Sequence, residues 1–346
     1  MSELITLTID GVEVKAEPGT TVLRAALANG IYIPHLCDHP DLTSVGICRV
    51  CLVEIEGRRP TVSCKTPVEE GMVVTTANED LDNTRRVNLE LLVLNHDYNC
   101  QECAKNSKCQ LQELTRYIGL DDNRLKAMRK PQLDLPIDDS NPFYKRDMNK
   151  CVLCGICVRT CAEIQGDSAI DFAYRGMKTT ISVLGNKPII DSTCVTCGEC
   201  VSRCPVGALV PREAVEPTYE VETICPFCGC GCGIVVGARG GKIVSSRGVD
   251  ASPANSGSLC VKGRYGLGFV NSPARLTTPL IRKDGELVEA SWEEALHLVA
   301  EKLGQYKGDQ FAAIASAKCT NEDNYVMQKF TRAVMETNNI DHCARL

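Results

Sequence analysis

The feature that most limits how this chain can fold is a pair of four-cysteine runs, each spaced C-x2-C-x2-C-x3-C. One run spans residues 151–161 and the other spans residues 194–204. Thiols this crowded are disulfides in oxidising compartments and metal ligands in the cytosol. The start of the chain, Met1–Asp10, has no basic region, apolar stretch or twin arginine of an export signal, so we expect a cytoplasmic protein. The runs therefore indicate metal ligands, and zinc does not explain two such runs at this spacing.

Both runs resemble those of bacterial two-cluster ferredoxins, where the fourth cysteine of each run ligates the cluster of the other run. The resemblance implies that residues 141–216 form such a domain. One [4Fe–4S] cluster would be held by Cys151, Cys154, Cys157 and Cys204. The second would be held by Cys161, Cys194, Cys197 and Cys200. The proline that follows the fourth cysteine in this family is present as Pro205 but is Ala162 in the first run.

Residues 1–78 predict a small mixed sheet crossed by one helix. In residues 4–9, Leu4, Thr6 and Thr8 alternate with Ile5, Leu7 and Ile9, as in a strand. Asp10-Gly11, between this segment and residues 12–15, is a strong signal for a hairpin turn. Thr20 or Thr21 can cap a helix that ends near Gly30, and residues 51–55 and 73–76 again read as strands.

Four cysteines of this first domain follow the pattern C-x10-C-x2-C-x12-C, at Cys37, Cys48, Cys51 and Cys64. Plant-type [2Fe–2S] ferredoxins share the middle gap but have a shorter first gap. The longer gap resembles the ferredoxin-like module of the largest peripheral subunit of respiratory complex I. That resemblance implies a β-grasp fold with one [2Fe–2S] cluster; the alternative is a structural zinc site.

Residues 79–120 predict a small helical domain, with a helix over Asp80–Asn95 followed by the pattern H-x3-C-x2-C-x5-C. The same pattern after a [2Fe–2S] module is found in complex I and iron hydrogenases. It implies a [4Fe–4S] cluster on His96, Cys100, Cys103 and Cys109. A neutral imidazole in place of a thiolate should raise the cluster potential; the alternative is that His96 is a bystander. Residues 121–140 are charged and proline-containing, and we expect a linker.

Residues 217–275 resemble the entry-cluster domain of molybdopterin oxidoreductases, especially cytoplasmic formate dehydrogenases. The pattern C-x2-C-x3-C-x27-C implies a [4Fe–4S] cluster on Cys225, Cys228, Cys232 and Cys260. We expect a small glycine-rich sheet, with Gly229, Gly231, Gly233 and Gly237 letting the backbone approach the cluster. Lys262 matches the family lysine that bridges cluster and pterin, or is a surface lysine. We expect Cys230 to be a buried thiol outside the ligand set.

Residues 276–346 match the opening of the same family's catalytic region, through Arg275–Arg282 and Ser291–Leu296. Ser291 and Glu294 predict a capping box for a helix that ends near Leu303. A buried strand over Phe311–Ser316 and a helix over Asn321–Thr337 should follow. One strand–helix unit cannot cover both faces of a parallel sheet, so this segment predicts the first part of a larger α/β molybdopterin domain.

The last run, Asn339–Leu346, resembles the sequence just before the metal-ligating cysteine or selenocysteine of formate dehydrogenases. The resemblance implies that this ligand would follow Leu346. We expect either a UGA codon or a deliberate boundary at that point. Because no catalytic residue is expected within it, this chain alone should transfer electrons without turning over formate.

Charge and composition limit the classes of partner that this chain can bind. The net charge is −6 and the isoelectric point is about 5.5, which disfavours nucleic acid. No apolar run approaches the roughly 20 residues that span a bilayer. Gly237–Gly241 lacks the G-x-G-x-x-G spacing of a dinucleotide site, so a flavin or NAD(P) site should lie on another subunit. Of the 22 cysteines, Cys230, Cys319 and Cys343 belong to no predicted ligand set.

The sequence thus predicts an α+β, multi-domain electron-transfer portion of a formate dehydrogenase, which oxidises formate or reduces CO2. It would carry one [2Fe–2S] and four [4Fe–4S] clusters, and the complete enzyme would add a molybdenum or tungsten bis-molybdopterin guanine dinucleotide. We expect a linear relay from the Cys225 cluster through the two ferredoxin clusters and the His96 cluster to the [2Fe–2S] cluster. The resemblance implies complex-I-like flavin- and NAD(P)-binding partner subunits, in an ordinary or an electron-bifurcating complex. Alternatives are a complex I large subunit, a hydrogenase-associated subunit and a stand-alone multi-cluster ferredoxin carrier.

Overall fold

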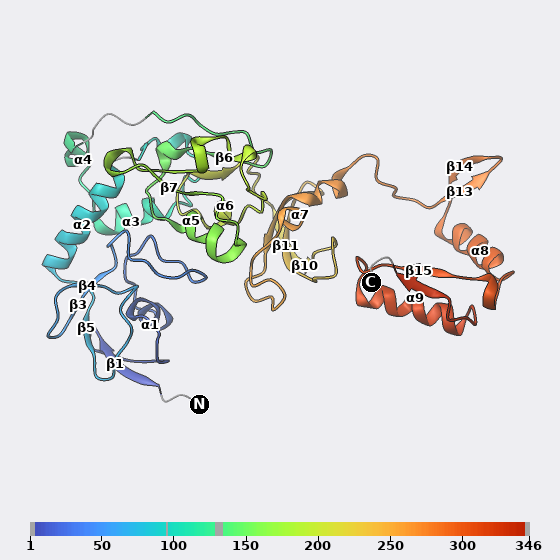
Figure 1. Ribbon diagram of the computed structural model, residues 1–346, viewed down its shortest axis with the longest axis horizontal. Helices are drawn as coiled ribbons and strands as arrows, with labels where there is room; N and C mark the ends of the chain where they lie inside the picture. The colour runs from blue at the N-terminus through green and yellow to red at the C-terminus, as the bar shows by residue number, and fades with distance from the viewer. Residues whose placement is uncertain (1–3, 95, 129–133, 343–346) are drawn as a thin grey trace. The chain divides into compact units, whose positions relative to one another are not determined.

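The computed structural model describes residues 4–94, 96–128 and 134–342 (Figure 1). The chain divides into two compact units, Met1–Ala214 and Val215–Leu346, and each is described by itself. Among the described residues, no helix has both the length and the apolar character that crossing a membrane requires.

The first unit begins with the mixed sheet that the sequence predicted. Its strands lie in the order β2-β1-β5-β3-β4, with β1 and β2 antiparallel and β1 and β5 parallel. The strands are β1 (Ile5–Ile9), β2 (Val12–Ala16), β3 (Leu52–Ile55), β4 (Thr61–Val62) and β5 (Val73–Thr75). Helix α1 (Val22–Ala28) is capped by the Thr21 side chain and buries Leu23 and Ala26 in the core of the sheet domain. The β-grasp prediction is confirmed.

Helix α2 (Glu79–Val93) is fixed to this sheet by a buried arginine. Asn78 caps it by accepting the N–H of Leu81. Arg85 is 2% exposed and donates to the carbonyl oxygens of Thr76, at 2.6 Å, and Leu52. Because those two carbonyls lie beside β5 and β3, the helix is held by polar as well as apolar contacts.

The predicted linker contains a helix that the sequence reading missed. Helix α4 covers Asp122–Met128 and follows α3 (Gln110–Ile118). The Asp121 carboxylate accepts the N–H of Asn123 at 2.8 Å, and Leu125 is buried in the larger core of the unit. A side-chain cap and one buried leucine are enough to order a single helical segment here; residues 129–133 of the predicted linker lie outside the described residues.

The rest of the first unit consists of short elements wound around the two cysteine runs. Strands β6 (Tyr144–Arg146) and β9 (Leu209–Pro211) pair antiparallel, as do β7 (Asp171–Ala173) and β8 (Thr180–Ser182). A short helix begins inside each run: α5 (Ile156–Arg159) in the first and α6 (Glu199–Arg203) in the second. α5 leads directly into a π-helical turn over Thr160–Gln165, and five 3-10 turns cover Cys100–Glu102, Met148–Lys150, Gly176–Lys178, Leu184–Asn186 and Ile189–Asp191.

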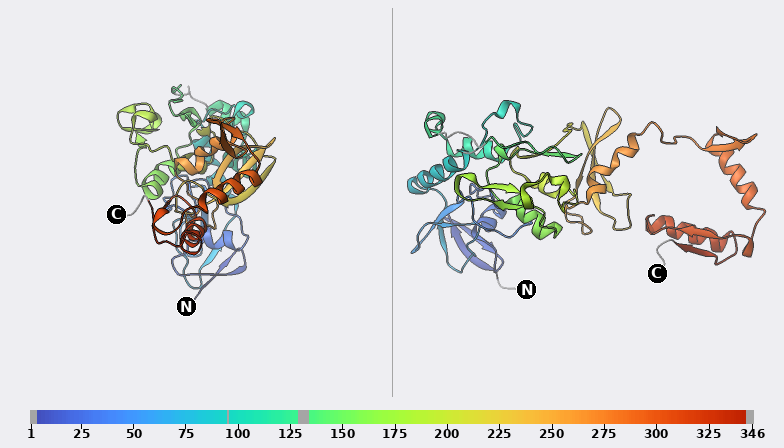
Figure 2. Two further views of the ribbon diagram at one scale, coloured as in Figure 1. Left: turned by 90° about the vertical axis from the view of Figure 1, so that its right-hand side faces the viewer. Right: turned by 45° about the horizontal axis from the view of Figure 1, so that its top comes forward.

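The second unit starts with a three-stranded antiparallel sheet in the order β10-β11-β12. Its strands are β10 (Tyr219–Ile224), β11 (Gly233–Arg239) and β12 (Lys242–Gly248). Helix α7 (Val261–Tyr265), followed by a 3-10 turn over Gly266–Asn271, packs beside β12, and Figure 2 shows the yellow strands and the orange helix together. A small core of Cys225, Ile234, Leu259 and Leu267 joins them.

The remaining elements of this unit follow the predicted order. They are β13 (Leu280–Lys283), β14 (Glu286–Glu289), α8 (Trp292–Leu303), a 3-10 turn (Gly308–Gln310), β15 (Ala313–Ala315), α9 (Asn321–Ala333) and β16 (Ile340–His342). Ser291 caps α8 as predicted, but the Glu294 carboxylate binds Lys283 at 2.9 Å. The strand β15 pairs parallel with β16, yet Ile314 is 82% exposed, so the prediction of a fully buried strand is wrong for this residue.

Candidate iron–sulfur cluster sites

Two cavities in the ferredoxin-like part of the first unit are lined by cysteines from both runs. One is lined by Cys161, Cys194, Cys197 and Cys200. The other is lined by Cys151, Cys154, Cys157 and Cys204. The structure therefore groups the fourth cysteine of each run with the first three of the other. Four thiols that converge on one cavity form the donor set that an iron–sulfur cluster needs.

The two runs wrap their cavities with the same backbone geometry. Leu153 and Thr196 occupy equivalent positions and have φ values of 54° and 59°. Their N–H groups point to the sulfurs of Cys151 and Cys194, each at 3.4 Å. A leucine or a β-branched threonine in the left-handed region costs about 1–3 kcal/mol and persists only where the surroundings impose it. Nothing in the residue types signals this conformation; only the repeated spacing does.

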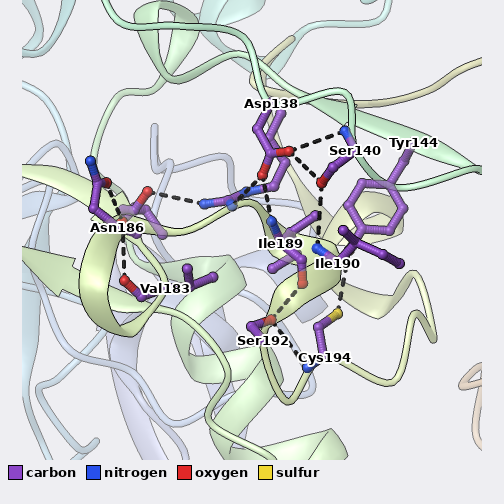
Figure 3. Close-up of polar contacts among 12 residues, drawn as sticks. Asp138, Ser140, Tyr144, Val183, Asn186, Ile189, Ile190, Ser192 and Cys194 are labelled. Carbon is purple, nitrogen blue, oxygen red and sulfur yellow. Dashed lines mark hydrogen bonds and ion pairs between the residues drawn. The ribbon is translucent and has the colours of Figure 1, made fainter.

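A buried tyrosine contacts one predicted ligand directly. The Tyr144 hydroxyl lies 3.4 Å from Cys194 Sγ, and Tyr144 is 1% exposed (Figure 3). Burial first, and then the contact with Cys194, raises the pKa of Tyr144 far above its usual range, so the hydroxyl stays protonated. A ligating thiolate can only accept, so the hydroxyl donates to it. The sequence reading missed this residue.

The loop that carries Cys194 is itself held by polar contacts. The N–H of Cys194 donates to Ser192 Oγ at 3.2 Å, and the N–H of Ile189 donates to the Asp138 carboxylate at 2.9 Å (Figure 3). Asp138 also pairs with Arg146 at 3.0 Å, and both side chains are largely buried. These contacts fix the loop in the position that brings the sulfur under the tyrosine.

Burial makes the thiols of these sites poor acids on their own. It raises the pKa of Cys151 to about 11, and it raises the pKa values of Cys154 and Cys200 further. Neighbouring thiols add to the effect, because a second negative charge in the same cavity is unfavourable. Bound cations reverse this preference by stabilising thiolates. The donor set and its burial therefore fit iron–sulfur clusters.

A third cavity is lined by His96 and the three cysteines predicted to share its cluster, Cys100, Cys103 and Cys109. His96 Nδ1 lies 3.0 Å from the carbonyl oxygen of Lys150. A carbonyl only accepts, so Nδ1 carries the hydrogen and Nε2 keeps its lone pair for a metal. Burial lowers the pKa of His96 and keeps the ring neutral. This geometry fits a ligand better than a bystander.

The His96 cavity adjoins the site of the first run at two points. Lys150, whose carbonyl binds His96, directly precedes Cys151. On the other side, a Cβ atom added at Gly207 would overlap Cys103 Sγ, and Gly207 follows Cys204 by three positions. The absence of a side chain at Gly207 therefore makes room for a predicted ligand of the neighbouring site.

The four cysteines of the first domain are buried and form two pairs. Cys37 and Cys48 contact each other, and so do Cys51 and Cys64. These contacts hold the pKa of Cys37 at about 6 and that of Cys51 at about 7, while the pKa of each partner is raised. Two thiol pairs fit the two irons of a [2Fe–2S] cluster better than one zinc ion.

The [2Fe–2S] site lies against the first ferredoxin run. Cys37 and Cys48 belong to the same apolar core as Cys154, whereas Cys51 and Cys64 belong to the core of the sheet domain. A Cβ at Gly155 would lie 3.1 Å from the Ile47 side chain. The site of the first run therefore adjoins both the His96 site and the [2Fe–2S] site, and the order of the relay stays a prediction.

In the second unit, burial first, and then the neighbouring thiols, raise the pKa values of Cys225 and Cys232, so the cysteines of this region lie close together. The N–H of Cys225 donates to the Cys232 carbonyl at 2.8 Å. Cys225 is buried, whereas Cys228 and Cys260 are exposed. Cys230 is also exposed, so the prediction that it is a buried thiol is wrong.

The glycines of this region have a different role from the predicted one. A Cβ at Gly233 would crowd Ser252, and one at Gly237 would crowd Ser245 and Pro217. Gly263, which was not singled out, is the glycine beside a thiol, with its Cβ position 3.6 Å from Cys225 Sγ. Lys262 is exposed on α7. This position is compatible with a residue that bridges cluster and pterin and with an ordinary surface lysine.

Of the unassigned thiols, Cys230 contacts the predicted ligand Cys232. Cys319 is exposed. Cys343 and the end of the Asn339–Leu346 run lie outside the described residues, so the structure does not address the predicted position of the metal ligand.

Five family models match successive parts of the chain. They are a 2Fe-2S iron-sulfur cluster binding domain at residues 2–79 and an NADH-ubiquinone oxidoreductase-G iron-sulfur binding region at 85–124. A 4Fe-4S dicluster domain follows at 150–208. The molybdopterin oxidoreductase Fe4S4 domain matches 218–272, and the molybdopterin oxidoreductase model matches 275–346.

Several curated proteins resemble almost the whole chain. An NADH-quinone oxidoreductase subunit of Rhizobium meliloti is 38% identical over 99% of this chain and 40% of its own length. The alpha subunit of the NADPH-Fe(3+) oxidoreductase of Geobacter sulfurreducens is 37% identical, with the same coverage. The Bacillus subtilis protein named "Putative formate dehydrogenase YrhE" is 35% identical, again over 99% of this chain and 40% of its own length. The chain thus spans about 40% of the length of these relatives.

A solved structure covers the iron–sulfur part. A chain of an NAD+-reducing [NiFe]-hydrogenase is 35% identical, with a TM-score of 0.57 over 62% of this chain and 90% of its own. The domain order, the thiol-lined cavities and these relatives agree. The chain belongs to the molybdopterin oxidoreductase family and is an iron–sulfur electron-transfer chain of that family, with complex-I-like domains ahead of the Fe4S4 domain.

Proposed function

We propose that this chain holds one [2Fe–2S] and four [4Fe–4S] clusters on the five predicted ligand sets and conducts electrons for a cytoplasmic formate dehydrogenase. The electrons would pass between a molybdenum or tungsten bis-pterin site, where formate is oxidised or CO2 reduced, and a flavin- and NAD(P)-binding partner subunit.

One observation carries the electron-transfer part of the proposal. The chain brings Cys161 to the second run and Cys204 to the first, across 43 residues, and each resulting set of four thiols lines one cavity. When bound there, an iron–sulfur cluster supplies reversible electron transfer at a potential set by charge, hydrogen bonds and exposure. The residues of the chain bury the thiols, orient them and donate hydrogen bonds to them.

The spacing between sites also supports conduction. Arg146, Ile170 and Leu209 line both ferredoxin cavities, so one layer of side chains separates the two sites. Lys150 and Gly207 connect the first-run site to the His96 site in the same way. Closely spaced sites with shared walls suit electron transfer, whereas purely structural metals need no such proximity.

The ligand sets are tested by metal content and spectroscopy. Anaerobically purified chain should contain about 18 iron and about 18 acid-labile sulfide ions, with EPR signals of one [2Fe–2S] and several [4Fe–4S] clusters after reduction. Cys161→Ser should abolish one cubane signal, whereas Cys319→Ser, which changes an exposed thiol, should leave the iron content intact. Substantial zinc, or low iron after full reconstitution, would show that some of these sites are structural.

The formate part rests on the resemblance of residues 217–346 to formate dehydrogenases and on the relative named for that activity. It is tested on the assembly that carries this chain in its native host. Under anaerobic conditions formate should bleach the visible absorption of the clusters, and NADH or NADPH should do so through the partner subunit. If NAD(P)H reduces the clusters and formate does not, the formate assignment fails while the electron-transfer role stands.

A hydrogenase-associated role is the second candidate, because the solved relative is a chain of an NAD+-reducing hydrogenase. Reduction of the native assembly by H2 instead of formate would favour it. A stand-alone carrier is distinguished by deleting residues 276–346: a self-sufficient carrier should stay folded and keep all its clusters. A complex I large subunit is a further alternative, because an NADH-quinone oxidoreductase subunit of Rhizobium meliloti is 38% identical over 99% of this chain.

A further inference from the structure

Arg159 is a buried cation placed between two candidate cluster sites. It lies at the end of α5, inside the first cysteine run, and is 8% exposed. Its guanidinium donates to the Cys37 carbonyl oxygen at 2.5 Å and to the Thr43 carbonyl oxygen at 2.6 Å. Cys37 is a predicted [2Fe–2S] ligand, so an arginine of one domain binds the ligand loop of another.

The surroundings do not neutralise this charge. Among the described residues Arg159 forms no ion pair with a carboxylate, and its buried Nε has no hydrogen-bond partner. A buried charge is unfavourable unless an opposite charge lies nearby. The buried thiols of residues 37–64 provide that charge when they are deprotonated, because a cluster with four thiolates is anionic.

Other contacts hold the same loop independently of Arg159. The N–H of Thr43 donates to the Glu163 carboxylate at 2.8 Å, and Asp41 pairs with Arg203 at 2.8 Å. The loop is therefore tied to both cysteine runs, and removing the Arg159 guanidinium leaves two polar anchors in place. A variant of Arg159 can therefore lose the charge while the loop keeps its position.

We propose that Arg159 is a positioning residue that holds the Cys37 loop against the first ferredoxin run and raises the reduction potential of the [2Fe–2S] cluster. The inference rests on the proposed cluster set. Reduction adds a negative charge to the cluster, and a nearby buried cation stabilises that state more than the oxidised state. Removing the cation should therefore make the cluster harder to reduce.

The test is an EPR-monitored redox titration of the full chain with Arg159→Gln, Arg159→Lys and a control, Arg49→Gln. Arg49 directly follows the ligand Cys48 but is exposed, so water and salt screen its charge. We expect the glutamine variant to lower the reduction equilibrium constant of the [2Fe–2S] cluster about tenfold, which is 59 mV for one electron. The lysine variant should lower it less, because it keeps the charge but cannot reach both carbonyls as arginine does.

Several results would overturn the proposal. One is an unchanged [2Fe–2S] potential in Arg159→Gln with full iron content, and another is an equal shift in Arg49→Gln. If the glutamine variant loses iron, the lysine variant decides, because it keeps the charge: a retained cluster with a potential at or slightly below that of the wild type supports the role, and a fall of about 59 mV or more refutes it. A wild-type chain without any [2Fe–2S] signal would instead refute the ligand set itself, and the inference with it.

Discussion

Removing one hydroxyl group, by Tyr144→Phe, should lower the potential of a single cluster. The hydroxyl is buried and donates to Cys194 Sγ at 3.4 Å (Figure 3). The phenylalanine ring occupies the same space, so packing on β6 is retained. Reduction increases the negative charge on the ligating sulfurs, so a donated hydrogen bond stabilises the reduced state more than the oxidised state. Its loss therefore disfavours reduction.

The size of the effect follows from the contact. A hydrogen bond to a charged group contributes about 1.5–3 kcal/mol, and sulfur is a weaker acceptor than oxygen. Only the difference between the two oxidation states changes the potential, and we take this as about 1 kcal/mol. Since a tenfold change is about 1.4 kcal/mol or 59 mV for one electron, the expected shift is roughly −40 mV.

The assay is an anaerobic redox titration followed by EPR on full-length wild type and variant with matched iron content. Tyr174→Phe is the control, because Tyr174 is 63% exposed in the same domain. The shift should be confined to the cluster of the second run. An unchanged potential, or an equal shift in both ferredoxin clusters, would refute the claim that this hydrogen bond tunes the site.

Three further predictions concern assembly. Gly207→Ala should displace Cys103, because the added Cβ overlaps its sulfur, and the chain should lose about four irons. Gly268→Ala is the control and should lose no iron, because no atom lies near the added Cβ. Equal iron content in both variants would contradict the steric argument. His96→Ala should lose the same cluster, while His96→Cys should keep it with a lower EPR-determined potential, since a thiolate is more electron-rich than imidazole. Burial raises the pKa of Cys151 to about 11, and iron binds the thiolate, so cluster reconstitution should release protons. The iron content after reconstitution should therefore be higher at about pH 9 than at about pH 7. An iron content that does not depend on pH would argue against buried thiols as ligands.

Local patterns in the sequence were sufficient for much of the fold. The Asp10-Gly11 turn predicts the β1–β2 hairpin, and a threonine cap predicts the start of α1, because both signals act within a few residues. The short helix α4 was missed although Asp121 offered a cap, since the region has few apolar residues and Leu125 alone joins it to the core.

The sequence by itself determined the candidate ligands, because cysteine spacing within a run is a property of the chain. It also predicted, through resemblance, which distant cysteines share a site, and those ligand assignments remain predictions. Only the tertiary structure decided what surrounds each site: Tyr144 on Cys194, Arg159 on the Cys37 loop and Gly207 beside Cys103. The physical reason is distance along the chain. These residues meet the ligands through packing between segments 50 to 122 positions apart, and no local pattern encodes such contacts.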